Sequence, residues 1–197
     1  MRYNPNIHHR KSIRLKGYDY SQCGAYFITI CTQNRENYLG RILNGQIELN
    51  DIGQIVEQCW LETQKRFENI FIDQFIIMPN HFHGIVIIKN NPINHRRGLI
   101  NQTPTTHQTP TTQQIPTTEK WILQKNPKLV LGKIIRSYKA SASRLIHLNG
   151  FHHFRWQQNY YEHIIRNKYE LNRIREYIIN NPIQWELDRN NARNIFK

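Results

Sequence analysis

Residues 71–89 have the sequence FIDQFIIMPNHFHGIVIIK and hold two consecutive apolar runs. The two runs, 71–79 and 81–89, are rich in β-branched and aromatic residues, which favour strands. The turn-forming pair Pro79-Asn80 separates them. We therefore predict two consecutive strands, both buried in the core of the molecule.

His81 and His83 lie in the second of these strands. Because successive side chains of a strand point to opposite faces, both imidazoles project together and Phe82 points to the other side. Two imidazoles on one face of a rigid strand form a ready bidentate metal site. The pair can also be two partly buried histidines with local hydrogen bonds, and the pair alone does not decide between these interpretations.

The rest of the chain supplies further strands and helices in alternation. Apolar periodicity and turn residues place their approximate limits. The predicted elements are a strand at 25–32, a hairpin within 36–50 that turns at Asn44-Gly45, a helix at about 52–68 capped by Asp51, a helix at 128–147, an extended or strand segment at 153–165, and a helix at 168–181 that ends before Pro182.

The predicted helix at 128–147 has a strongly basic face. Lys133, Arg136, Lys139 and Arg144 fall in one half of the helical wheel, and apolar residues fill most of the other half. A solvated charged face is common on helices. This face has no acidic residue to balance it, which favours a surface that contacts phosphates.

The charge of the whole chain points in the same direction. Lys and Arg number 27 against 14 Asp and Glu, a formal net charge of +13. Such an excess favours a nucleic-acid partner, although a merely basic soluble protein is the alternative. The three cysteines form no CxxC pair, and neither a secretory signal nor a membrane span is recognisable. We therefore expect a cytoplasmic protein with reduced thiols and no membrane partner.

The domain organisation is predicted from composition. Residues 1–20 form a basic N-terminal arm, and residues 21–197 form a single domain. A flexible Thr/Pro/Gln-rich insertion interrupts this domain at 92–118, where 102–118 reads as three hexads, QTPTTH, QTPTTQ and QIPTT. A true linker between two domains is the alternative, but neither side alone has enough apolar material for a core.

A second chemical pattern lies in the last predicted helix. Tyr177 and Asn181 are four residues apart and therefore share one face, with Arg173 one turn earlier. A tyrosine beside a metal can attack a phosphodiester and form a covalent phosphotyrosine. The alternative is that Tyr177 is one of the ten tyrosines that simply pack in the fold.

Two blocks together carry a resemblance to a known family. MPNHFHGIVI, followed by WQQNYYEHIIRNKYELNRIREYIINNP, resembles the REP-associated tyrosine transposases, IS200-like members of the single-tyrosine HUH transposase superfamily. The resemblance covers nearly the whole chain outside the N-terminal arm and the insertion. It implies an α+β, ferredoxin-like fold, in which an antiparallel sheet has its helices packed on one side.

The resemblance also implies roles for four residues. His81 and His83 match the histidine pair that binds a divalent metal, Tyr177 matches the nucleophile, and Asn181 matches the third metal ligand. Mg²⁺ or Mn²⁺ suits such a shell. Because this ligand set contains no carboxylate, we expect modest metal affinity.

The implied activity is metal-dependent nicking and strand transfer of single-stranded DNA at hairpin-forming repeats, through a 5′-phosphotyrosine intermediate. The alternatives are a catalytically idle hairpin-binding protein of the same fold and an RNA-directed metal nuclease. A homodimer and a monomer are both compatible with the sequence. The expected DNA-backbone contacts are Lys133, Arg136, Lys139, Arg144, Arg155, Arg166 and Arg173, with Tyr160 or Trp156 as candidates for base stacking.

Overall fold

A computed structural model describes residues 18–20, 22–89, 131–188 and 190–191. The predicted insertion at 92–118 and all but the last three residues of the predicted arm at 1–20 lie outside these ranges. The elements in chain order are β1 (Gly24–Cys31), η1 (Gln33–Arg35), β2 (Gly40–Leu43), β3 (Gln46–Leu49), α1 (Asp51–Arg66), β4 (Ile70–Met78), β5 (His81–Ile88), α2 (Leu131–Leu148), β6 (Tyr161–Ile165), α3 (Lys168–Asn180) and η2 (Trp185–Leu187).

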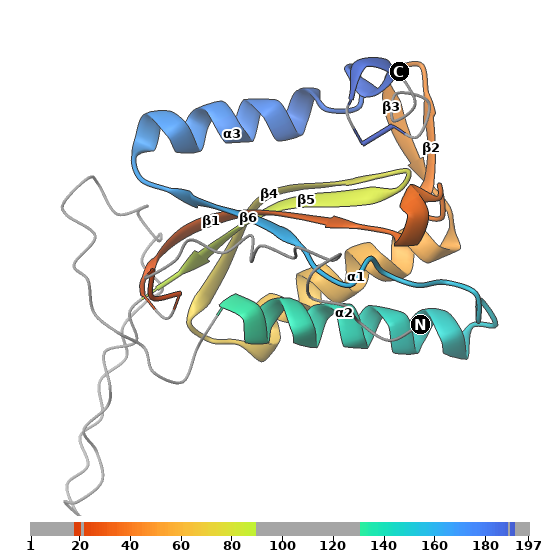
Figure 1. Cartoon of the computed structure of the whole chain (residues 1–197), viewed down its shortest axis with the longest axis horizontal. Coiled ribbons are helices and arrows are strands. Elements are labelled where there is room, and N and C mark those ends of the chain that lie inside the picture. Colours follow the sequence, from red (N-terminus) through yellow and green to blue (C-terminus); the bar gives the residue numbers. More distant parts are fainter. Residues whose placement is uncertain (1–17, 21, 90–130, 189, 192–197) are drawn as a thin grey trace, which may run out of the picture.

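The central sheet has four strands in the order β4-β5-β1-β6, and each neighbouring pair is antiparallel. The helices α1 and α2 connect these strands in the chain order β1-α1-β4-β5-α2-β6 (Figure 1). This is the split βαβ arrangement of the ferredoxin-like fold. The predicted α+β class and the antiparallel sheet are confirmed.

The short hairpin of β2 and β3 stands apart from the central sheet. Its turn residues Asn44 and Gly45 have φ values of 50° and 73°, as a two-residue hairpin turn with two left-handed residues requires. This agrees with the turn that the Asn-Gly pair predicts. A Cβ added at Gly45 would lie 3.5 Å from Ile183 Cγ1, so the turn lies against the segment that follows α3.

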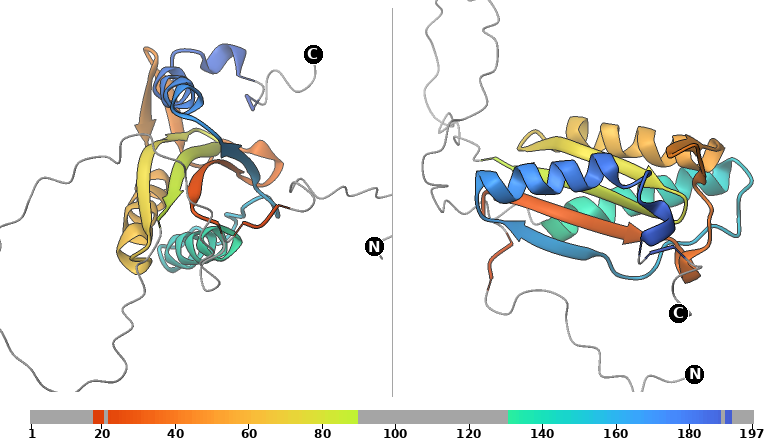
Figure 2. Two further views of the ribbon diagram at one scale, coloured as in Figure 1. Left: turned by 90° about the vertical axis from the view of Figure 1, so that its left-hand side faces the viewer. Right: turned by 90° about the horizontal axis from the view of Figure 1, so that it is seen from above.

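One face of the sheet is covered by α1 and α2 (Figure 2). Trp60 of α1 and Phe82 of β5 have ring centroids 4.6 Å apart, and those of Trp60 and Tyr138 of α2 are 5.0 Å apart. Gly84 makes this packing possible, because an added Cβ would lie only 2.6 Å from Phe82 Cζ and 3.1 Å from Trp60 Cζ2. This face holds the larger of the two apolar clusters.

The start of α1 differs by one residue from the prediction. Asn50, in an extended conformation, accepts a hydrogen bond from the Gly53 N–H at 3.0 Å and is the cap, whereas Asp51 is the first helical residue. At this position Asp51 places its negative charge in the first turn, where the helix dipole favours it.

The other face of the sheet is covered by α3, and this corrects the expectation that all helices pack on one side (Figure 2). Ile174 and Ile178 of α3 pack on Phe27 and Ile85 of the sheet. The physical reason is that the central strands carry apolar side chains on both faces, so a second layer is needed to exclude water from them. Ile174 and Ile178, the buried residues of α3, therefore lie against the face opposite α1 and α2.

Asp73 and Arg175 form an ion pair that ties α3 to β4. The two nitrogen–oxygen distances are 2.5 Å and 2.8 Å, and the Asp73 side chain is almost fully buried. Burial raises the pKa of Asp73. The hydrogen bonds from Arg175 and from the Gln74 N–H, together with the charge of Arg175, outweigh this effect and leave the pKa below its usual value. The pair therefore fixes where α3 lies on the sheet.

The lengths and compositions of the described helices bear on whether they could span a bilayer. None of them combines enough length with enough apolar character to cross a membrane.

Candidate active site

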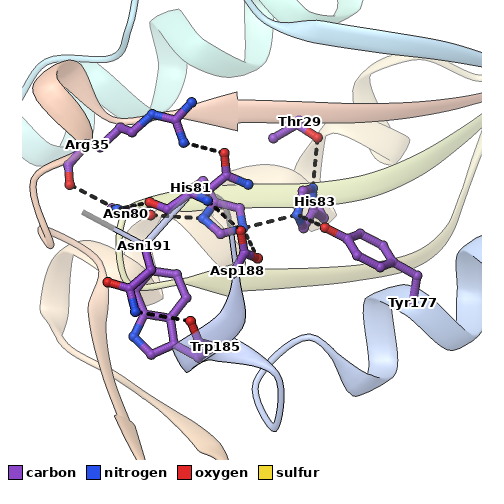
Figure 3. A network of polar contacts seen from close by, with 10 residues as sticks. Thr29, Arg35, Asn80, His81, His83, Tyr177, Trp185, Asp188 and Asn191 are labelled. Carbon is purple, nitrogen blue, oxygen red and sulfur yellow. Dashed lines mark hydrogen bonds and ion pairs between the residues drawn. The ribbon is translucent and has the colours of Figure 1, made fainter. Parts of the chain in front are cut away.

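His81 and His83 lie side by side on the face of β5 that is turned toward α3 (Figure 3). Both are buried, and their Nε2 atoms are 3.0 Å apart. Phe82 points the opposite way, into the cluster around Trp60. The alternation of the strand thus produces the shared imidazole face that the sequence predicts.

A partner at each Nδ1 orients the two rings. Asn80 Oδ1 is 2.9 Å from His81 Nδ1, and Thr29 Oγ1 is 2.8 Å from His83 Nδ1. The amide orientation of Asn80 is fixed, because its Nδ2 donates to the backbone carbonyls of Arg35 and Asn190. Asn80 Oδ1 can only accept, so His81 Nδ1 must carry a proton. A neutral His81 therefore presents a lone pair at Nε2, as a metal ligand must.

Asp188 completes a group of three candidate ligands. Its Oδ2 lies 3.8 Å from His81 Nε2, its side chain is buried, and the ligand atoms of all three residues lie within 4.8 Å of one another. The sequence-based expectation of a ligand set without a carboxylate did not include Asp188, which the structure places within reach of both histidines. Metal ligands in one small buried space suit a divalent cation, and a carboxylate oxygen suits the hard ions Mg²⁺ and Mn²⁺.

The segment after α3 brings Asp188 to the histidines. It folds back as the short helix η2, and the Trp185 ring stacks on His81 with centroids 5.9 Å apart. Asn191 Nδ2 donates to the Trp185 carbonyl at 3.0 Å, and the backbone N–H of Asn190 donates to Asp188 Oδ1 at 2.6 Å. Asp188 was not predicted as a site residue from the sequence, because no local pattern marks it. Only the return of the chain after α3 brings it close to the histidines.

Asn181 is the C-cap residue of α3 and is 2% exposed. Among the residues that the structure describes, its Oδ1 has no hydrogen-bond partner, although it is buried. Such an orphaned acceptor costs free energy unless a ligand satisfies it. Asn181 also lines one cavity together with His83 and Asp188. Its amide oxygen therefore fits a role toward a cation in this space.

Tyr177 lies one turn before Asn181 and faces the same cavity. Its hydroxyl is 3.2 Å from His83 Nε2 (Figure 3), and its ring meets Phe27 edge-on at a centroid distance of 6.0 Å. The side chain is 39% exposed. The hydroxyl is thus held beside the histidines while the residue remains accessible to a substrate.

Three further tyrosines lie near the same part of the sequence. Tyr161 of β6 is 40% exposed and lines the cavity that Tyr177 lines. Tyr160 packs on the core cluster of the opposite face, and Tyr169 is 80% exposed at the start of α3. Of these, Tyr161 alone shares the cavity with Tyr177.

The predicted DNA-contact residues do not lie on one surface. Lys133, Arg136 and Arg144 are exposed on α2, on the opposite side of the sheet from Tyr177. Arg173 lines the cavity beside Tyr177. Arg155 and Arg166 are exposed, and Arg155 Nη1 donates to the carbonyls of His152 and Phe154 at 2.6 Å and 2.7 Å.

Lys139 has a different environment from the other basic residues of α2. Its Nζ lies 2.6 Å from the Gln157 carbonyl oxygen and 3.3 Å from that of Gln158, so it holds the segment that leads into β6. Burial lowers the pKa of Lys139 to about 8. Its ammonium group is therefore engaged within the protein.

Comparisons with known proteins show a family relationship and the fold of the chain. The chain is 44% identical over 190 residues to an uncharacterized protein of Haemophilus influenzae, a match that covers 95% of this chain and 96% of the relative. The two proteins belong to one family. Among solved structures, a REP-associated tyrosine transposase bound to a REP hairpin matches with a TM-score of 0.50 and 17% identity, over 87% of this chain and 74% of that one. The chain has the fold of the REP-associated tyrosine transposases.

At 17% identity the similarity to the REP-associated tyrosine transposase concerns the fold. No protein-family model matches the chain. The roles of individual residues therefore depend on the geometry of this structure, in which strand β5 carries both histidines and helix α3 carries the tyrosine against it.

Proposed function

We propose that the protein is a metal-dependent enzyme that nicks single-stranded DNA beside a hairpin and rejoins it through a covalent 5′-phosphotyrosine, with Tyr177 as nucleophile. The observation that carries the proposal is the position of the Tyr177 hydroxyl, 3.2 Å from His83 Nε2 in a cavity shared with Asn181 and Asp188. A hydroxyl on a partly exposed tyrosine, beside a group of candidate metal ligands, is the arrangement that phosphoryl transfer to a side chain needs.

The residues present fit a divalent cation. His81, His83 and Asp188 would bind it, and the orphaned amide oxygen of Asn181 would add a further oxygen. Mg²⁺ and Mn²⁺ accept such a mixed nitrogen and oxygen set. When bound, the ion would polarise the scissile phosphate and stabilise the charge that develops on it.

The chemical step on the protein side belongs to Tyr177. Its phenolic oxygen attacks the phosphorus, the bond from phosphorus to the 3′ oxygen breaks, and a phosphotyrosine ester forms. The tyrosine loses one proton and the departing 3′ oxygen gains one, so the step balances. A 3′ hydroxyl that attacks the ester reverses these changes, restores a phosphodiester and releases Tyr177. Retention of the bond in the ester is what permits strand transfer as well as nicking.

The proposed partner is single-stranded DNA that contains a hairpin. The structurally similar REP-associated tyrosine transposase was solved with a REP hairpin, and this chain carries a formal net charge of +13. Exposed Lys133, Arg136 and Arg144 on α2 would contact the DNA backbone. A hairpin-binding protein without turnover and an RNA nuclease that does not use Tyr177 are the two competing functions.

A covalent adduct separates these functions. The full chain is incubated with Mn²⁺ and a hairpin oligonucleotide labelled at its 3′ end, because the fragment with the 5′ phosphate is the one that stays joined to tyrosine. The proposal predicts a labelled protein band that survives denaturation and disappears with a chelator. An RNA oligonucleotide of the same sequence is the matched control, and it should form no adduct.

Tyr177→Phe tests the nucleophile. We expect this variant to fold and to bind DNA as the wild type does, and to form adduct at a level lower by on the order of a thousandfold or more. Tyr161→Phe is the matched control from the same cavity and should retain adduct formation. An adduct that persists in Tyr177→Phe and is lost in Tyr161→Phe would assign the chemistry to the other tyrosine.

A further inference from the structure

We propose that the cavity beside Tyr177 is a binding subsite for one unpaired nucleotide, the one that adjoins the phosphate to be cut. Arg173 contacts its phosphate and Tyr161 stacks on its base. This inference rests on the proposed function for the position of the scissile phosphate, whereas the binding itself can be measured without any chemistry.

The size and position of the cavity suit a nucleotide. Its volume is about 520 Å³, which lies within the range of pockets that take small ligands. It reaches from His83 and Asp188 at one end to Tyr161 and His163 of β6 at the other. Because β6 is an edge strand, this second end lies at the margin of the sheet, where an extended DNA strand can leave. The cavity therefore accommodates more than a phosphate group.

Arg173 supplies the charge that a phosphate requires. It is exposed, it lines the cavity, and it lies one turn before Tyr177 on the same side of α3. Within the described part of the chain, Arg173 forms no ion pair, whereas Arg175 on the same helix is paired with Asp73. A guanidinium group can donate two hydrogen bonds to one phosphate. Arg173 is thus a cation of α3 that lines the cavity and remains available to a ligand.

Tyr161 and His163 supply aromatic surface at the other end. Both belong to β6 and are two residues apart, so both face the cavity. Tyr161 is 40% exposed, whereas His163 is held by Glu170, whose Oε1 lies 2.6 Å from His163 Nε2. An exposed aromatic ring that shares a cavity with a cation is a combination that suits the stacking of an unpaired base. Stacking accepts any base, so the subsite should show little base preference.

The test measures the binding of thymidine 3′,5′-bisphosphate by calorimetry in the presence of a chelator. The full chain with Tyr177→Phe is used, so that neither metal nor covalent chemistry contributes. We expect Arg173→Gln to weaken binding about tenfold and Tyr161→Ala to weaken it about fivefold. Tyr161→Phe retains the stacking ring and should bind as the parent does. Lys65→Gln, an exposed cation near the end of α1 that has no part in the proposed site, is the control and should also leave binding unchanged.

Two results would overturn the inference: equal binding by Arg173→Gln and the parent, or inorganic phosphate that binds as tightly as the bisphosphate. Neither result changes the interpretation of the adduct experiment, because that experiment does not depend on this affinity. Conversely, the protein could bind the bisphosphate through Arg173 and Tyr161 and yet form no adduct. That result would support the subsite and contradict the proposed enzymatic function. The two proposals can therefore fail separately.

Discussion

The two faces of the central sheet are built from the same strands but carry different kinds of side chain. The face under α1 and α2 is closed by large apolar rings, among them Trp60, Phe82 and Tyr138. The face under α3 has a smaller apolar cluster and places buried polar groups beside it, including His81 and His83. Adjacent residues of β5 belong to different faces. One strand can therefore stabilise the fold with one set of side chains and supply the proposed site with the other.

The largest effect on activity is expected from changes on the face under α3, where His81 and His83 lie. Replacing His81 or His83 with Ala should lower cleavage on the order of a thousandfold and abolish Mn²⁺ binding, because each removes one of three ligands grouped within 4.8 Å. Asp188→Asn should weaken Mn²⁺ binding as well, and Asn181→Ala should do less harm, since water can replace an amide oxygen. Calorimetry with Mn²⁺ measures this. Equal Mn²⁺ binding by the wild type and His81→Ala would show that these three residues do not form the metal site.

The next largest effect is on stability and is expected from changes on the face under α1 and α2. Phe82→Ala should lower the free energy of unfolding by about 3–5 kcal/mol, because it opens a cavity beside Trp60. His83→Ala, one residue away, should cost only about 1 kcal/mol for its lost hydrogen bond to Thr29. Denaturant titrations of both variants test the contrast. Similar losses in the two variants would mean that the faces are not divided between stability and chemistry.

A smaller effect tests how α3 is held. Asp73→Asn should lower the free energy of unfolding by about 1–3 kcal/mol, because it breaks the charged hydrogen bonds to Arg175. The pKa of Asp73 is lowered in the folded state, so this stabilisation is present above about pH 4 and is lost as the pH falls further. The wild type should therefore lose more stability between pH 5 and pH 2 than the variant.

Glu48→Gln is the matched control for this ion pair, because it breaks the exposed pair with Arg41. Its unfolding should change little at either pH. A loss in Glu48→Gln as large as that in Asp73→Asn would show that burial does not distinguish the two pairs.

The smallest effect is on DNA affinity and is expected from changes on the exposed surface of α2. Changing both Lys133 and Arg136 to Glu should weaken binding to all DNA sequences alike and flatten the salt dependence of the affinity, by about one in the log–log slope for each cation removed. Lys139→Gln is the informative comparison, since its Nζ is bound to the carbonyls of Gln157 and Gln158. We expect little change in its salt slope. A loss limited to one hairpin sequence would mean instead that these side chains read bases.

Local periodicity explains how much of this could be predicted. The two-residue repeat of β5 determines that His81 and His83 share a face, and the helical repeat of α3 determines that Tyr177 and Asn181 do. Both relations hold in the structure, where His83 and Tyr177 also come within 3.2 Å of each other. The Asn44-Gly45 turn was equally predictable, because few residues adopt its left-handed conformations.

The sequence by itself therefore determined the strands, the helices and which neighbours along the chain point the same way, because these depend on interactions over a few residues. Only the tertiary structure decided that α3 covers the face opposite α1 and α2, that Asp188 returns to His81, and that Lys139 is engaged by carbonyl oxygens. Each of these joins residues that are distant in the chain or placed by packing. They follow from the need to bury both sides of the sheet and to satisfy buried polar groups, which no local pattern records.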